Sequence, residues 1–201
     1  LLVMVDNVSR YIIGDTTMDK DGTKISNIIQ NNIRRIEKRF GHTVKELVMD
    51  RGTEFTDKMG ITCRFSSIQD HAANARAEKT IQTITLDTRT LLLQNKLKPI
   101  FWKYAVQAAI NARNCVCNKQ IDNAPIKLLS KDNIEIYLKS FLPFGAPATI
   151  WQETKNKLQS SSKHAITLCK DPEGSGQNMS HHTMTEIHHY STWKIRNHSL
   201  L

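Results

Sequence analysis

Two acidic residues are candidates for metal chemistry, and the first of them is Asp50. The apolar segment Val44–Met49 has strand character and ends at this aspartate, and Gly52 and Glu54 follow directly. A strand end holds a carboxylate in a fixed position, which suits a metal ligand in phosphoryl transfer. Asp and Gly after a strand also mark ordinary turns. The residues alone leave both interpretations of Asp50 open.

The second candidate is Glu78, near the start of a helix predicted over about Ala75–Gln94, with Arg76 and Lys79 beside it. Two divalent ions at a phosphodiester need several carboxylate oxygens from different elements, which pairs Glu78 with Asp50. The alternative is a solvated helix acid in a salt bridge. We expect Arg76 and Lys79 to bind nucleic acid.

The elements that would position these residues indicate an α/β domain with a sheet of mixed direction. Alternation and helical spacing predict strands at 1–5, 11–16, 44–49 and 61–65, and helices at 23–40, 75–94 and from Pro99 onward. Gly41 is expected to end the first helix. Core candidates on the later helices are Ile81, Ile84, Leu91, Leu92, Phe101, Tyr104, Ala105, Ala108 and Ala112.

The domain is predicted to end near residue 118. Residues 119–175 contain several prolines and an isolated strand at Ala165–Cys169, which indicates a small β-containing extension. Residues 176–201 are polar and rich in histidine, and we expect a disordered tail.

Charge and composition suggest a polyanionic partner. The 201 residues carry a formal net charge of +9, and only 6% are aromatic. Few aromatic side chains are therefore present on which bases could stack, and contacts of Lys and Arg with phosphates are the favoured mode of binding. No apolar run approaches the length of a membrane span.

A structural zinc site is not favoured. The four cysteines include no C-x-x-C pair, so reduced thiols are expected. The pairs His181–His182 and His188–His189 fall in the predicted tail, where unligated histidines are the favoured interpretation.

Several motifs, in order, resemble the integrase core of copia-type LTR retrotransposon Pol polyproteins, with the greatest likeness to the yeast Ty-element integrases. They span about residues 1 to 175 and are Val5–Tyr11, Met49–Phe55, Ala75–Lys79, Phe101–Val106, Asn111–Asn114, Ser140–Gly145 and Leu168–Pro172.

The resemblance implies a ribonuclease-H-like fold and a D,D-x-E site for Mg²⁺ or Mn²⁺. It also implies trimming of element DNA ends and their transfer into target DNA. By position, Asp50 is similar to the second catalytic aspartate and Glu78 to the catalytic glutamate, both metal ligands. DNA, with RNA as a further candidate, would be the partner, in a homo-oligomer that acts in the nucleus after a cytoplasmic particle stage.

Two departures from the family pattern count against activity. The family's first aspartate lies on a strand before Leu1, so we expect the chain to be a piece of a longer protein; Asp6 aligns with a hairpin turn instead. Only 27 residues separate Asp50 from Glu78, where the family has about 35, and the shortage falls at Thr56–Gly60. Ala75 also stands where the family usually has Gly, and the loss of Gly is expected to stiffen the loop ahead of Glu78.

The sequence therefore predicts an integrase core that is catalytically inactive. Two alternatives stay open: a non-catalytic, basic nucleic-acid-binding protein derived from a transposon, and a relic that does not fold stably.

Overall fold

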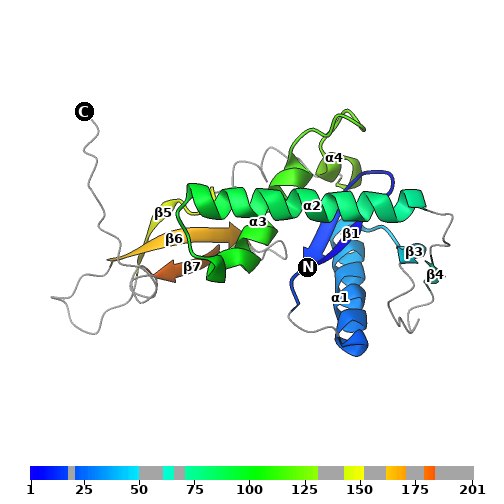
Figure 1. Cartoon of the computed structure of the whole chain (residues 1–201), viewed down its shortest axis with the longest axis horizontal. Helices are drawn as coiled ribbons and strands as arrows, with labels where there is room; N and C mark the ends of the chain where they lie inside the picture. Colours follow the sequence, from blue (N-terminus) through cyan, green and yellow to red (C-terminus); the bar gives the residue numbers. More distant parts are fainter. Residues whose placement is uncertain are drawn as a thin grey trace.

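The computed structural model describes residues 1–17, 21–49, 61–65, 71–130, 143–151, 162–170 and 179–183. These residues form a mixed α/β structure, in which α2 runs from the side of the β3–β4 pair to the C-terminal sheet (Figure 1). The elements are β1 (Leu2–Val5), β2 (Ile12–Asp15), α1 (Gly22–Phe40), β3 (Glu46–Met49), β4 (Thr62–Phe65), α2 (His71–Gln94), η1 (Pro99–Phe101), α3 (Trp102–Cys115), α4 (Pro125–Leu129), β5 (Pro147–Trp151), β6 (Ser162–Lys170) and β7 (Met179–Thr183).

The described strands fall into three small sheets. β1 and β2 form an antiparallel hairpin, β3 and β4 pair in parallel, and β5, β6 and β7 form an antiparallel sheet with β6 in the centre. The predicted α/β class is confirmed, with both strand directions present. Among the described residues, parallel and antiparallel pairs occur in separate sheets, whereas one sheet of mixed direction was expected.

Helix α1 covers one face of the hairpin. It begins where Asp21 accepts a hydrogen bond from the Thr23 amide at 3.1 Å, and it ends at Gly41, whose φ is 67°. Its isoleucines recur every three or four residues, so they share one face. That face packs against the two N-terminal strand pairs in a cluster of Ile25, Ile29, Ile33, Leu2, Met4, Leu47, Met49 and Ile61.

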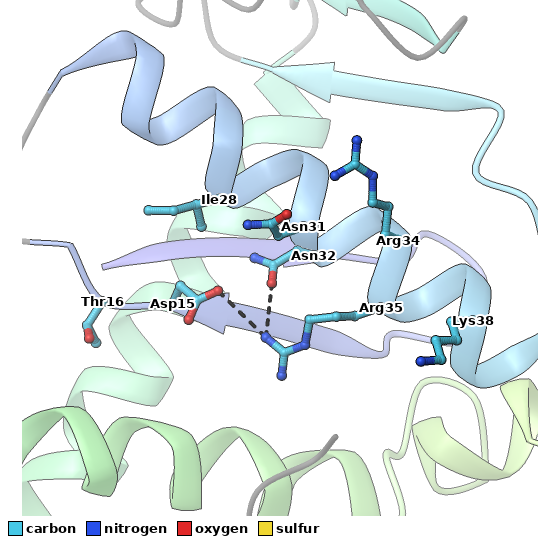
Figure 2. Close-up of a pocket in the computed structure, with 8 residues that line it drawn as sticks. All are labelled: Asp15, Thr16, Ile28, Asn31, Asn32, Arg34, Arg35 and Lys38. Carbon is cyan, nitrogen blue, oxygen red and sulfur yellow. Dashed lines mark hydrogen bonds and ion pairs between the residues drawn. The ribbon is translucent and has the colours of Figure 1, made fainter. Parts of the chain in front are cut away.

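The same helix makes a polar contact with the end of β2. Nη1 of Arg35 lies 3.9 Å from Oδ2 of Asp15 and donates to Oδ1 of Asn32 at 3.3 Å (Figure 2). Asn32 is fully buried between the isoleucines of the core face. A polar side chain therefore occupies a core position at this end of the hairpin.

Helix α3 is buried on two sides. One side joins the C-terminal sheet in a cluster of Phe101, Ala105, Ala108, Phe144, Ile166 and Leu168. The other side joins α2 in a cluster of Ile84, Val106, Ala109 and Ile110. Most of the core candidates predicted on this helix lie on the first side, but Ala112 is exposed, so that residue was wrongly assigned. A single stripe cannot describe a helix that packs in two directions.

Asn114 attaches α3 to the hairpin. Its Oδ1 accepts from the Ile12 amide at 2.8 Å, and its Nδ2 donates to the Ile12 carbonyl at 2.7 Å. The side-chain amide therefore satisfies both backbone groups of Ile12, as a neighbouring strand would. Gly14 lies two residues after Ile12 in β2, and a Cβ there would be 2.8 Å from Cδ1 of Ile110. The absence of a side chain at Gly14 lets α3 approach the hairpin.

Three features of these elements differ from what the sequence predicts. Helix α2 begins at His71, before the predicted start at Ala75, and the alanines that follow His71 explain the extension because alanine favours helix. β6 was predicted to be isolated, yet it has a partner on each side. β7 lies within the predicted tail; pairing with β6, rather than any local pattern, makes residues 179–183 a strand. None of the helices in the described ranges is long and apolar enough to cross a membrane.

Candidate nucleic-acid interface

The two predicted metal ligands are not brought together within the described residues. Asp50 and the Thr56–Gly60 segment lie outside them, and Glu78 is exposed on α2. No group of three or more His, Cys, Asp and Glu side chains that could hold a metal ion occurs in the part of the chain that the structure describes. One exposed carboxylate does not hold a divalent ion that needs several oxygen ligands. The metal site stays a prediction.

The predicted nucleic-acid-binding residues Arg76 and Lys79 line a pocket of about 560 Å³ between the hairpin and the helices α2 and α3. We call it the hairpin pocket. Nη1 of Arg76 donates to Oδ1 of Asn7 in the hairpin turn, which ties the start of α2 to that turn. Arg10 and Arg113 complete a set of four cations, and no Asp or Glu is among the described lining residues.

The hairpin turn holds Arg10 in a strained conformation. Oδ2 of Asp6 accepts from the Val8 amide at 3.2 Å and from the amide and hydroxyl of Ser9, each at 2.7 Å. Oγ of Ser9 then accepts from the Tyr11 amide at 3.2 Å. These bonds confirm that Asp6 is a turn residue. Between them Arg10 has φ +61°, a left-handed conformation that is uncommon for residues other than glycine.

Part of the Arg10 guanidinium is buried without a hydrogen-bond acceptor among the described residues. Its Nε and Nη1 atoms are buried and have no hydrogen-bond partner among the described residues. A guanidinium carries its positive charge at every pH at which proteins fold, so burying it without a partner costs free energy. An anion in the hairpin pocket would offset that cost. Arg10 was not predicted from the sequence to be a binding residue. The one sequence feature that could have indicated it is a bulky cation in a turn that contains Asp, Asn and Ser.

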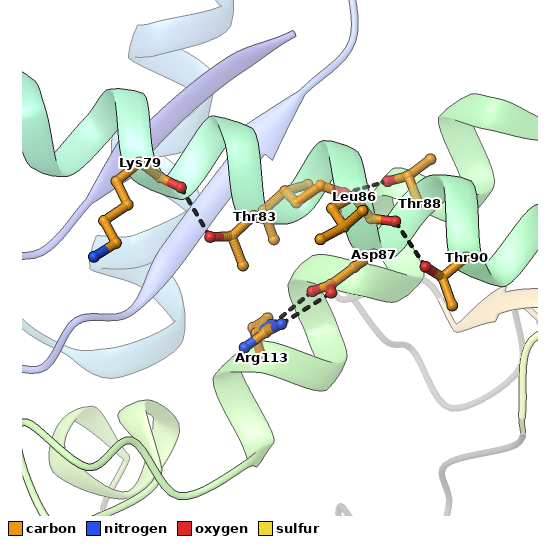
Figure 3. Close-up of polar contacts among 8 residues, drawn as sticks. Lys79, Thr83, Leu86, Asp87, Thr88, Thr90 and Arg113 are labelled. Atoms are coloured by element: carbon orange, nitrogen blue, oxygen red, sulfur yellow. Dashed lines mark hydrogen bonds and ion pairs between the residues drawn. The ribbon is translucent and has the colours of Figure 1, made fainter.

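Arg113, unlike Arg10, is paired. Its Nε and Nη2 donate to the two carboxylate oxygens of Asp87 at 2.6 and 2.9 Å, linking α3 to α2 (Figure 3). These hydrogen bonds raise the pKa of the Arg113 guanidinium, partly opposed by burial. Arg10, Arg76 and Lys79 therefore supply most of the uncompensated charge in the hairpin pocket.

The hydroxyl groups of Thr80 and Thr83 offer few free donors to the hairpin pocket. Oγ1 of Thr83 donates to the Lys79 carbonyl at 2.9 Å (Figure 3). Oγ1 of Thr80 donates to the Arg76 carbonyl, also at 2.9 Å. Both hydroxyl donors are used within α2. The polar character of the pocket is thus set by its cations.

No protein-family model matches the sequence. The structure is similar to a chain in the cryo-EM structure of the simian T-cell lymphotropic virus intasome in complex with the PP2A regulatory subunit B56 gamma, with a TM-score of 0.53 and 13% identity. The match covers 82% of this chain and 62% of that chain, so the present chain corresponds to less than two thirds of it. At this identity the likeness is one of fold alone.

Proposed function

We propose that this chain is an integrase-like core with a ribonuclease-H-like ancestry that binds nucleic acid and does not catalyse strand transfer. The observation that carries the proposal is the hairpin pocket, which has four cations and no carboxylate among its described lining residues. Two buried guanidinium nitrogens of Arg10 also have no hydrogen-bond partner in the described part of the chain. The ordered copia-type motifs and the likeness in fold to a chain of the intasome complex support the integrase-like part of the proposal.

The pocket suits the phosphate backbone better than the bases. Its described lining includes no Phe, Tyr or Trp on which a base would stack. Guanidinium and ammonium groups bind phosphate oxygens whatever the base sequence. Binding should therefore show little sequence preference and should weaken steeply as salt is added.

The expected test is the salt dependence of binding to a random-sequence DNA duplex, followed by fluorescence anisotropy. The double variant Arg76→Gln/Lys79→Gln should reduce the slope of log K against log salt by about 1 to 2, since each lost phosphate contact contributes about 0.9. The matched control is Lys45→Gln/Lys98→Gln, which removes the same charge from exposed positions away from the pocket. Equal slopes for both double variants would reject the proposal.

Loss of catalysis is a separate part of the proposal. It follows from the shortened spacing between Asp50 and Glu78, the two residues that would share the metal ions. The purified chain should not join a DNA end to a target with Mg²⁺ or Mn²⁺. Joining that depends on the metal and disappears in Asp50→Asn would show that the core is active. The same ancestry makes self-association and action in the nucleus part of the proposal.

A further inference from the structure

A second cationic pocket lies on the opposite face of the hairpin. Side chains alternate along each strand, and the register pairs Val5 with Ile12 and Leu2 with Asp15. Val5 and Ile12 line the hairpin pocket, whereas Leu2 packs toward α1. Asp15 shares that second face and lines a pocket of about 510 Å³ against α1 (Figure 2). We call it the α1 pocket.

Positive charge dominates the α1 pocket. Its lining includes Arg34, Arg35 and Lys38, against the single carboxylate of Asp15. Oδ2 of that carboxylate lies 3.9 Å from Nη1 of Arg35. Arg34 and Lys38 are four residues apart on α1 and exposed, so both are placed to reach one bound anion.

The α1 pocket also contains a buried donor whose hydrogen bond is unmade. Asn32 is fully buried and lines the pocket, and its Oδ1 is held by Arg35. Its Nδ2 is buried with no hydrogen-bond partner in the described part of the chain. Leaving such a group without an acceptor costs free energy. A bound anion, or a water that the anion orders, would supply the missing acceptor after a small side-chain movement.

We propose that the α1 pocket is a second phosphate-binding site, separate from the hairpin pocket. Arg34 and Lys38 bind the phosphate oxygens, and Asn32 and Arg35 form the floor. Because the two pockets face in opposite directions, a phosphate bound here comes from a second nucleic-acid segment or from a free polyphosphate. Only the first source rests on the proposed function.

The first experiment titrates inorganic pyrophosphate and follows backbone amides by NMR. The Asn31 amide reports on the α1 pocket and the Arg76 amide on the hairpin pocket. We expect saturable shifts at both amides. In Arg34→Gln/Lys38→Gln, affinity at Asn31 should fall at least about tenfold, as expected for losing a charge-assisted contact, with Arg76 unchanged. The absence of a saturable shift at Asn31, or an equal affinity in the variant, would overturn the proposal.

The second experiment separates the two sources. The protein is bound to an immobilised duplex, and the capture of a second, labelled duplex is measured. Capture by the wild type and by Lys45→Gln/Lys98→Gln, but not by Arg34→Gln/Lys38→Gln, would assign the site to nucleic acid. Equal capture in all three would exclude nucleic acid as the source. Failure to bind the first duplex would count against the proposed function and leave the pyrophosphate result intact.

Discussion

The first residue of β2 and the turn before it differ in whether their polar groups have hydrogen-bond partners among the described residues. At Ile12, the side chain of Asn114 satisfies the backbone N–H and C=O with bonds of 2.8 and 2.7 Å. At Arg10, only two residues earlier, the backbone is strained and two buried guanidinium nitrogens have no hydrogen-bond partner among the residues that the structure describes. The contrast occurs within one hairpin.

This difference distinguishes a structural contact from the proposed phosphate-binding site. Native proteins satisfy nearly all buried polar groups, because each unmade bond costs free energy. A strained residue with an uncompensated charge persists only where the surrounding structure enforces it, as Asp6 and Ser9 do here. Substitutions on the two sides of this contrast should therefore have opposite effects on stability.

The largest effect is expected at the structural contact. Asn114→Leu removes both hydrogen bonds and leaves the backbone groups of Ile12 without partners beside a buried helix. The free energy of unfolding should fall by about 2–4 kcal/mol, the cost of two unmade bonds in a buried setting. Urea denaturation measures it. Asn27→Leu, at an exposed position on α1, is the control and should change stability by less than about 0.5 kcal/mol. A similar small change for Asn114→Leu would show that water replaces its bonds.

A second, smaller effect tests how closely α3 packs on the hairpin. In Gly14→Ala, the new Cβ would lie 2.8 Å from Cδ1 of Ile110 and 2.9 Å from the Leu2 carbonyl oxygen. Such overpacking should lower the free energy of unfolding by about 1–3 kcal/mol.

A double-mutant cycle identifies the cause of that loss. Ile110→Val removes the Cδ1 atom and alone should cost about 0.5–1.5 kcal/mol. In the Gly14→Ala background it should cost less or become stabilising, because it relieves one of the two close contacts. Additive effects would mean that the Leu2 carbonyl, and not Ile110, limits the approach.

Much of the fold could be predicted because its signals are local. The hairpin, α1 with its Gly41 cap, and the strands around 46–49 and 62–65 each follow from a pattern within a few residues. The start of α2 and the pairing of β7 could not be predicted in the same way. Strand β7 in particular depends on an edge that β6 supplies, and its own sequence has no alternation.

The site shows the same division between local and long-range information. Arg76 and Lys79 were predicted because they lie beside Glu78 in one short segment. Arg10 was missed because its importance arises only when the hairpin turn meets α2, a contact that joins Asn7 to Arg76 across 69 residues. No pattern in either segment predicts that contact. The role of Asp50 stays a prediction.

The smallest effect on stability is expected at Arg10 and has the opposite sign. Arg10→Gly removes the left-handed strain and the uncompensated charge, so the free energy of unfolding should rise by up to about 1 kcal/mol. Affinity for a DNA duplex should fall about tenfold, because a charge-assisted phosphate contact is lost. Arg10→Lys keeps both the charge and the strain, and should retain more affinity without gaining stability. A stability loss in Arg10→Gly, with unchanged affinity, would make Arg10 a packing residue; a gain in stability with a loss of affinity is expected only if the turn holds this side chain for a ligand.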